Sequence, residues 1–119
     1  MPCEEALRAF AAALHGYLSV NAGRAVAIAS LTGQKHIRVS LRAIRRFHEP
    51  TQNYLLFNDA FKELLKNPSW IGRLGWRLEE VDGEVYIVMP LSTLKKLLKA
   101  KDVERLVSML KDAGACRST

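Results

Sequence analysis

The stretch WRLEEVDGEVYIVMP, residues 76–90, carries the clearest local signal of structure in this chain of 119 residues. Its Asp-Gly pair at positions 82 and 83 is typical of a two-residue hairpin turn, and apolar and polar residues alternate on both sides of that pair. The turn sets Val81 opposite Glu84 and, by register, Leu78 opposite Ile87. We therefore predict a hairpin with two distinct faces. The core face carries Trp76, Leu78, Ile87 and Met89, and the other face carries Arg77, Glu79, Tyr86 and Val88.

Residues 24–40 predict a second hairpin upstream of the first. The segment RAVAIAS at 24–30 alternates Val and Ile with smaller alanines, and KHIRVS at 35–40 alternates Ile37 and Val39 with polar side chains. Patterns of period two that flank a short turn-like segment, here LTGQ at 31–34, are typical of paired strands. The two hairpins together predict a four-stranded antiparallel sheet.

Helices are predicted on either side of these hairpins. Residues 4–18 repeat apolar side chains at intervals of three and four, as does a segment between 53 and 66 that ends at the Asn-Pro pair 67–68. Ser40 is expected to cap a short helix at 41–48, which stops before Pro50. The predicted fold is therefore α+β, with a four-stranded antiparallel sheet from two hairpins packed with about five helices.

The C-terminal tail, residues 91–113, is expected to be helical with two apolar stripes that point in nearly opposite directions. Either the chain breaks near Asp102, which is a good N-cap residue, or one long helix buries both stripes and needs a partner chain. We expect a single domain, because 119 residues are too few for two cores of ordinary size. Within it, residues 1–91 form the α+β core and residues 92–119 form C-terminal helices that favour a homodimer or homotetramer.

The composition indicates a folded, cytoplasmic protein. Hydrophobic residues make up 49% and charged residues 25% of the chain, which is close to the average of globular proteins. No apolar run approaches the length of about 20 residues that spans a bilayer, and the start is acidic where a secretory signal would be positive. The two cysteines, Cys3 and Cys116, are interpreted as incidental thiols, with a bridge between the termini as the alternative.

The positive charge of the chain is concentrated in one region. The formal net charge is +6, and no Asp or Glu occurs between Ala6 and His48. That region holds Arg8, Arg24, Lys35, Arg38, Arg42, Arg45 and Arg46. A cationic surface of this kind attracts polyanions, of which nucleic acid is the commonest in a cell. Asn and Gln are scarce, which favours a thermophilic source.

Catalytic and metal-binding signatures are weak. The carboxylates near the Asp-Gly turn are expected to be solvated at a hairpin tip, and His15, His36 and His48 have no spacing that implies a shared metal. No nucleophile motif or phosphate-binding loop occurs. We therefore expect a protein that is not an enzyme and that needs no metal or cofactor.

Nucleic-acid binding is the favoured function, because arginines that neutralise phosphates occur together with rings that can stack on bases. On the helix expected at 41–48, three arginines lie on one side, opposite its apolar residues. Trp70 lies between two breakers and is expected to be a surface platform. This interpretation requires that the arginines have no acidic partners from the second half of the chain and that they do not point in unrelated directions. The candidate residues are Lys35, His36, Arg38, Arg42, Arg45, Arg46, Phe47, Tyr54, Trp70, Arg73 and Arg77.

Two other functions stay open from the sequence. In a winged-helix fold, residues 27–47 would form a helix-turn-helix. The segment SLRAIRRF at 40–47 would then be the recognition helix, and the Asp-Gly hairpin would be the wing. Such a protein would be a transcriptional regulator that binds double-stranded DNA. A module that uses its terminal helices to bind another protein would have no affinity for nucleic acid.

The order of elements, read from AVAIASLTGQKHIRVSLRAIRRFHEP and WIGRLGWRLEEVDGEVYIVMP, resembles the ThermoDBP-related single-stranded-DNA-binding proteins of hyperthermophilic archaea. The resemblance covers about residues 4–100. It implies a four-stranded antiparallel sheet packed with helices around an apolar cleft that basic residues edge. It also implies largely sequence-independent binding of single-stranded DNA by an oligomer, and RNA is a further possible ligand. The C-terminal stripes depart from the long zipper of some relatives.

Overall fold

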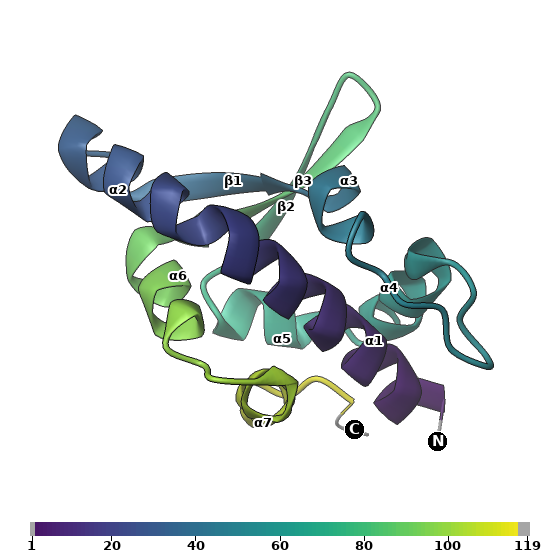
Figure 1. Cartoon of the computed structure of the whole chain (residues 1–119). Coiled ribbons are helices and arrows are strands. Elements are labelled where there is room, and N and C mark those ends of the chain that lie inside the picture. Colours follow the sequence, from purple (N-terminus) through teal and green to yellow (C-terminus); the bar gives the residue numbers. More distant parts are fainter. Residues whose placement is uncertain (1, 117–119) are drawn as a thin grey trace.

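A long N-terminal helical segment crosses one side of a small sheet, and shorter helices pack around both (Figure 1). The computed structural model describes residues 2–116. The elements in chain order are α1 (Pro2–Tyr17), the π-helical segment η1 (Leu18–Ala22), α2 (Gly23–Thr32), β1 (His36–Ser40), α3 (Leu41–Arg45), α4 (Phe57–Leu65), α5 (Ser69–Arg73), β2 (Arg77–Val81), β3 (Glu84–Pro90), α6 (Leu91–Leu98) and α7 (Val103–Asp112). None of the helices within residues 2–116 combines the length and the apolar character that crossing a bilayer requires.

The first strand of the predicted upstream hairpin is instead helix α2. Residues 2–32 run through α1, η1 and α2 without leaving helical geometry, and Gly23 at the last junction has φ −57° and ψ −43°. Alanine is the best helix former, and the segment 24–30 contains three alanines between its Val and Ile residues. The alternation that predicted a strand was therefore misleading, because the alanines favour a helix over a strand.

The segment predicted to be a hairpin turn is the C-terminal cap of α2. Gly33 takes the left-handed conformation at φ 73°, and its N–H donates to the carbonyl of Ala29. The N–H of Gln34 donates to the same carbonyl at 2.9 Å. A left-handed glycine just after the last turn, with backbone N–H groups that return to the final carbonyls, is a common end of a helix. A glycine between two apolar runs is thus compatible with either a hairpin turn or the C-terminal cap of a helix.

The sheet has three strands, in the order β1-β3-β2, and both pairs are antiparallel. The prediction of a four-stranded sheet was wrong, because residues 24–30 belong to α2. The downstream hairpin has the predicted register, with Val81 opposite Glu84 and Leu78 opposite Ile87. Strand β1 pairs with β3 rather than with residues 24–30, so that Val39 lies opposite Ile87. The α+β class holds with this smaller sheet.

The helices that follow strand β1 agree closely with the local signals. The Ser40 hydroxyl accepts a hydrogen bond from the Arg42 backbone N–H and caps α3, which ends at Arg45 rather than at the predicted residue 48. Helix α4 ends before the Asn-Pro pair at 67–68, as predicted. The tail breaks between α6 and α7, where the Asp102 carboxylate accepts from the Arg105 N–H. The alternative of one long helix is therefore excluded.

A cluster of aromatic rings forms the centre of the core. The Phe10 ring of α1 lies 5.5 Å from Phe61 and 6.0 Å from both Phe57 and Trp70, measured between ring centroids. The Trp70 ring in turn lies 5.9 Å from Trp76. Because α1 lies at this centre, its apolar residues on several sides are fully buried. These residues are Ala6, Leu7, Phe10, Ala11, Ala13 and Leu14.

A disulfide joins the two ends of the described chain. The Cys3 and Cys116 Cα atoms are 5.6 Å apart and their sulfurs are bonded. The interpretation of these cysteines as incidental thiols was wrong, because the packing of α7 against α1 brings the C-terminal segment back to the first turn of α1. Figure 1 shows the first turns of α1 and the segment that follows α7 in the same part of the molecule. The bridge closes a loop that contains nearly the entire domain.

The loop before α4 is held by Glu5, and this contact predicts a dependence of stability on pH. The Glu5 carboxylate accepts hydrogen bonds from the Thr51 hydroxyl at 2.6 Å and from the Asn53 backbone N–H at 2.8 Å. These hydrogen bonds lower the pKa of Glu5. A lowered pKa in the folded state means that this contribution is fully present above the ordinary glutamate range of about 4 to 5 and is lost as the pH falls through the folded-state pKa.

We therefore expect the Tm to fall on acidification below about pH 4 less steeply for the variant Glu5→Gln than for the wild type. Thermal melts followed by circular dichroism, over a series of buffers from about pH 3 to about pH 7, measure this difference. Parallel pH profiles for the two proteins would show that the Glu5 contacts do not contribute.

Candidate nucleic-acid interface

A groove lies between the β2–β3 hairpin, α3 and α4. It consists of two adjoining pockets that share Leu41, Asn58 and Val85 in their walls, with volumes of 190 Å³ and 430 Å³. The larger pocket has a mostly apolar wall, and the smaller one is bordered by Arg42 and Arg45. The remaining residues of the larger pocket are Phe61, Lys62, Leu65, Leu78, Glu79 and Glu80. The groove therefore has a mostly apolar part, bordered by Lys62, Glu79 and Glu80, and a polar end with Arg42, Arg45 and Glu84.

The hairpin creates this groove because it extends beyond the helices that cover the rest of the sheet (Figure 1). Leu78 belongs to the predicted core face and was expected to be buried, but its side chain is 37% exposed. Ile87, directly opposite on β3, is fully buried. The apolar face of the hairpin thus extends beyond the part that the helices bury. In this uncovered part, Leu78 and Val85 form one wall of the groove.

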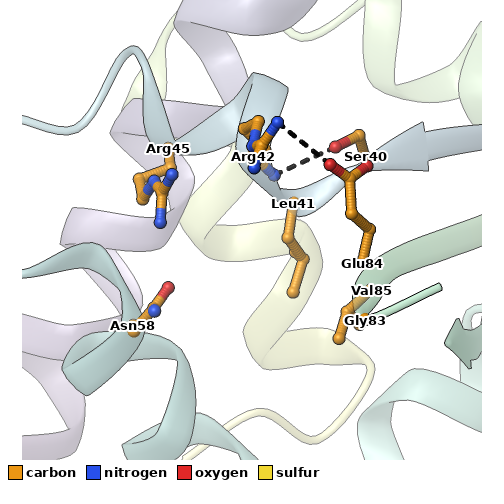
Figure 2. Close-up of a pocket in the computed structure, with 8 residues that line it drawn as sticks. All are labelled: Ser40, Leu41, Arg42, Arg45, Asn58, Gly83, Glu84 and Val85. Carbon is orange, nitrogen blue, oxygen red and sulfur yellow. Dashed lines mark hydrogen bonds and ion pairs between the residues drawn. The ribbon is translucent and has the colours of Figure 1, made fainter. Parts of the chain in front are cut away.

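Arg42 and Arg45 approach the smaller pocket from α3. Figure 2 shows Arg45 beside Asn58 on one side of the pocket and Arg42 beside Ser40 and Glu84 on the other. The Ser40 cap fixes the first turn of α3 against the end of β1, which determines where Arg42 points. The Arg42 guanidinium forms an ion pair with Glu84 at 3.0 Å.

A second group of predicted residues lies on the solvent face of the sheet. Arg38 of β1 pairs with Glu79 of β2 at 2.9 Å, and Arg77 contacts the same carboxylate at 3.0 Å. The Arg38 guanidinium also lies 5.8 Å from the centre of the Tyr86 ring, within the range of a cation–π contact. The Tyr86 hydroxyl donates to Glu84 at 3.1 Å, and this hydrogen bond raises the pKa of that hydroxyl.

The requirement that the arginines lack acidic partners from the second half of the chain is not met for three of them, Arg38, Arg42 and Arg77. Arg38 and Arg42 pair with Glu79 and Glu84, contacts that join residues more than 40 positions apart and cannot be found from local sequence. Both pairs are open to solvent, with the Arg42 side chain 62% exposed. Exposed pairs of this kind contribute about 0 to 1 kcal/mol, so a phosphate group can compete for either arginine.

The other cations of the region differ from Arg38 and Arg42 in their ion pairing. Among residues 2–116, Arg45, Arg46, Lys35 and His36 form no ion pair, and all four side chains are exposed. Arg45 borders the groove, whereas His36 lines a hollow with Arg38 and Arg77 on the solvent face of the sheet. The structure thus divides the predicted arginines between the groove and the sheet face.

Three of the predicted aromatic contacts are buried in the core or packed against it. Trp70 is fully buried, and its indole N–H donates to the Leu64 carbonyl at 3.0 Å. The prediction of a surface platform at Trp70 was wrong, because residues 69–73 form helix α5 and turn the ring inward. Tyr54 is 8% exposed, and the half-buried Phe47 ring lies directly over Gly16 of α1. None of these rings presents an open face to the groove.

Arg73 also lies apart from the other predicted cations. Its guanidinium lies beside Gly114, in the segment that follows α7. The groove instead uses apolar residues that the sequence pattern assigned to the core or did not single out, namely Leu41, Phe61, Leu65 and Val85, together with Lys62 and Asn58. The register of the Asp-Gly hairpin placed Leu78 on the right face, but only the position of the helices shows that this end of the face is uncovered.

Residues 27–47 do not form a helix-turn-helix. They contain the end of α2, strand β1 and the five-residue helix α3. A recognition helix that enters a major groove needs a supporting first helix across a tight turn, and here a strand occupies that position. Within residues 2–116, no three His, Cys, Asp or Glu side chains gather as a metal site would require.

Comparisons with protein-family models, with curated proteins and with solved structures gave no match to this chain.

Proposed function

We propose that this protein binds single-stranded nucleic acid without catalysis, with DNA as the first candidate and RNA as the second. The observation that carries this proposal is the groove under the β2–β3 hairpin, which combines an apolar wall with Arg42 and Arg45 at one end. An unpaired strand offers both flat apolar bases and a chain of phosphates. Guanidinium groups hold the phosphates, and the apolar wall removes the faces of the bases from water.

The single-stranded form fits this groove better than a duplex does. In a duplex the base faces are already stacked, so the apolar residues Leu41, Leu78 and Val85 would gain no contact. The groove has no exposed aromatic ring, and its base contacts are aliphatic apart from the edge of the buried Phe61. Binding is therefore largely independent of base sequence and weaker per base than stacking on an open aromatic ring.

Glu84 and Glu79 moderate the affinity. A phosphate that reaches Arg42 must displace Glu84, and one that reaches Arg38 must displace Glu79. Contacts of this kind release fewer counterions than contacts with unpaired arginines. The groove cations Arg42, Arg45 and Lys62, together with Arg46, which is exposed at the end of α3 outside the groove walls, give up to four contacts. Because each contributes at most about 0.7, the slope of log affinity against log salt lies between about −2 and −3.

One chain suffices to build this groove. The C-terminal helices bury their apolar residues within their own chain, with Leu94, Leu97, Leu106 and Leu110 each at most 1% exposed. This packing removes the reason to expect a homodimer or homotetramer through α6 and α7. We therefore place the binding unit in a single chain.

The disulfide bears on the proposed cellular setting. Disulfides are rare in the cytosol of mesophiles but occur widely in intracellular proteins of hyperthermophilic archaea. A cytoplasmic DNA-binding protein from such an organism, the setting that the sequence resemblance implies, accommodates the bridge between Cys3 and Cys116.

We expect the double variant Arg42→Gln, Arg45→Gln to bind a single-stranded DNA oligonucleotide at least about tenfold more weakly than the wild type in low salt. The slope of log affinity against log salt should fall in magnitude by up to about 1.4, which corresponds to the loss of two phosphate contacts. Fluorescence anisotropy with a labelled oligonucleotide at several salt concentrations measures both quantities.

Two further variants make this test specific to the groove. Arg73→Gln with Lys111→Gln removes the same charge on the side of the C-terminal segment, and its affinity should stay within about twofold of the wild type. Glu84→Gln removes the competitor of Arg42 and should strengthen binding. Equal losses in both double variants would indicate attraction to net charge alone and contradict a groove site.

A further inference from the structure

The connection between α6 and α7 carries a second cationic surface, which the sequence pattern did not single out. Its members are Lys96, Lys99, Lys101 and Arg105, and we call them the α6–α7 corner. All four are exposed, and none forms an ion pair with another residue in the described range 2–116. Lys99 and Arg105 line two adjoining hollows of 410 Å³ and 270 Å³. Lys101 borders the first hollow, and Lys96 borders the second.

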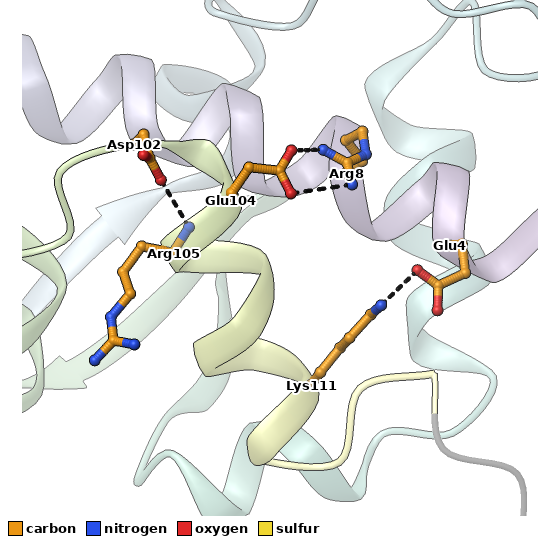
Figure 3. A network of polar contacts seen from close by, with 6 residues as sticks. All are labelled: Glu4, Arg8, Asp102, Glu104, Arg105 and Lys111. Carbon is orange, nitrogen blue, oxygen red and sulfur yellow. Dashed lines mark hydrogen bonds and ion pairs between the residues drawn. The ribbon is translucent and has the colours of Figure 1, made fainter.

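The two acidic residues nearest to this corner have other partners than the side chains of its four cations. The Asp102 carboxylate accepts from the Arg105 backbone N–H at 2.9 Å and so caps α7. Glu104 forms a two-pronged ion pair with Arg8 of α1. Figure 3 shows the Arg105 side chain extending away from Glu104 and Arg8. The corner therefore keeps its positive charge although two carboxylates lie within the same stretch of sequence.

Such a concentration of like charge has an energetic cost. Lys99 and Arg105 line the same two hollows, and Lys96 and Lys101 border one hollow each, so these like charges repel one another across the corner. Soluble proteins usually intersperse the two signs on their surfaces. Where cations gather on a surface without ion-pair partners in the fold, a ligand of opposite charge is the natural explanation.

The chemistry of the corner identifies that ligand as a phosphate backbone. The large apolar side chains that are exposed within residues 2–116 all lie outside α6, α7 and their connection. A membrane surface or a protein partner would be met by apolar residues next to the cations. A surface on which four exposed cations outnumber the two carboxylates Asp102 and Glu104 instead matches contacts that position a nucleic-acid strand without reading its bases.

We propose that the α6–α7 corner is a second contact for the backbone of the same strand that the groove binds, and this inference rests on the proposed function. In Figure 1 the α6–α7 connection and helices α3 and α4 lie on opposite sides of α1. The longest dimension of the molecule is 42 Å. A strand with the rise of about 3.4 Å per nucleotide found in a duplex needs about 12 nucleotides to run that length, and an unstacked strand, which extends about twice as far per nucleotide, needs about 6. An oligonucleotide of about 4 nucleotides therefore reaches only one of the two surfaces.

The test compares two lengths of single-stranded DNA, about 4 and about 30 nucleotides, on the full chain. For the double variant Lys99→Gln, Arg105→Gln we expect wild-type affinity for the short strand and at least about tenfold weaker binding of the long strand, with a salt slope smaller by about 1.4. The variant Lys96→Gln, Lys101→Gln should show the same pattern. Arg73→Gln with Lys111→Gln serves as the control, and thermal melts confirm that every variant is folded.

The outcomes separate the corner from the groove. If both corner variants bind the long strand as tightly as the wild type does, the corner is not a contact and the proposal is wrong. A second outcome is that the wild type binds the long strand but not the short one, and that the corner variants no longer bind the long strand. The proposal of a groove site is then wrong, and the proposal of a contact at the α6–α7 corner is supported. If neither strand binds to the wild type in low salt, both proposals are wrong.

Discussion

Replacing Cys3 by serine should lower the free energy of unfolding by about 4 to 5 kcal/mol, which is the largest single effect that we expect in this protein. The bridge to Cys116 spans 113 residues, so its loss releases the unfolded chain from a loop that includes nearly all of the domain. In the folded state the contacts of α7 with α1 remain, so the variant keeps the same fold with a lower stability. Denaturation in urea under non-oxidising and non-reducing conditions measures the loss.

Reduction of the wild type and the double variant Cys3→Ser, Cys116→Ser provide the matched controls. Both should show the same loss as the single variant, because each removes the same cross-link and nothing else in the core. A loss below about 1 kcal/mol in all three would mean that the bridge does not form in solution or does not restrict the unfolded chain.

Replacing Trp70 by alanine should cost about 3 to 5 kcal/mol, because the ring is fully buried between Phe10 and Trp76. The variant also leaves the Leu64 carbonyl without the indole N–H that donates to it. Replacing Trp70 by phenylalanine keeps a ring and should cost less, although the same carbonyl loses its partner. Urea denaturation followed by circular dichroism measures both values.

The result for Trp70 also distinguishes a core residue from a binding platform. If Trp70 were a surface platform for bases, its removal would leave stability within about 0.5 kcal/mol and weaken nucleic-acid binding instead. For the same reason, an oligonucleotide should change the tryptophan fluorescence only slightly when it binds in the groove, since Trp70 and Trp76 are at most 3% exposed.

Signals that act between near neighbours in the chain predicted the local structure well. The Asp-Gly turn gave the register of β2 and β3, Ser40 capped α3, and Asp102 marked the break between α6 and α7. In each case a side chain or a turn determines the geometry of residues within a few positions. The outcome is then insensitive to the rest of the fold.

Contacts between distant residues were not predictable in this way. The segment 24–30 satisfies both a strand pattern and the composition of a helix, and in the fold it continues the helical path of α1 and η1. The bridge between Cys3 and Cys116 and the pairs of Arg38 with Glu79 and Arg42 with Glu84 depend on how helices and strands pack. Whether a tryptophan faces solvent or the core likewise depends on the orientation of α5, which no local pattern gives.

The groove combines predictable and unpredictable features. The sequence placed Arg42 and Arg45 on one short helix, and the register placed Leu78 on the apolar face of the hairpin. That these residues border the same groove follows from α4, whose Asn58 and Phe61 complete the walls. The ingredients of the candidate site were therefore predictable, but their arrangement was not.

The most direct test of the groove is a competition titration of the wild-type protein. Labelled single-stranded DNA is bound first, and unlabelled single-stranded DNA, single-stranded RNA and duplex DNA of the same length compete at several salt concentrations. We expect a single strand to compete at least about tenfold better than the duplex, with a salt slope between about −2 and −3. Equal or better competition by the duplex, or no binding of single-stranded DNA in low salt, would contradict the proposed function.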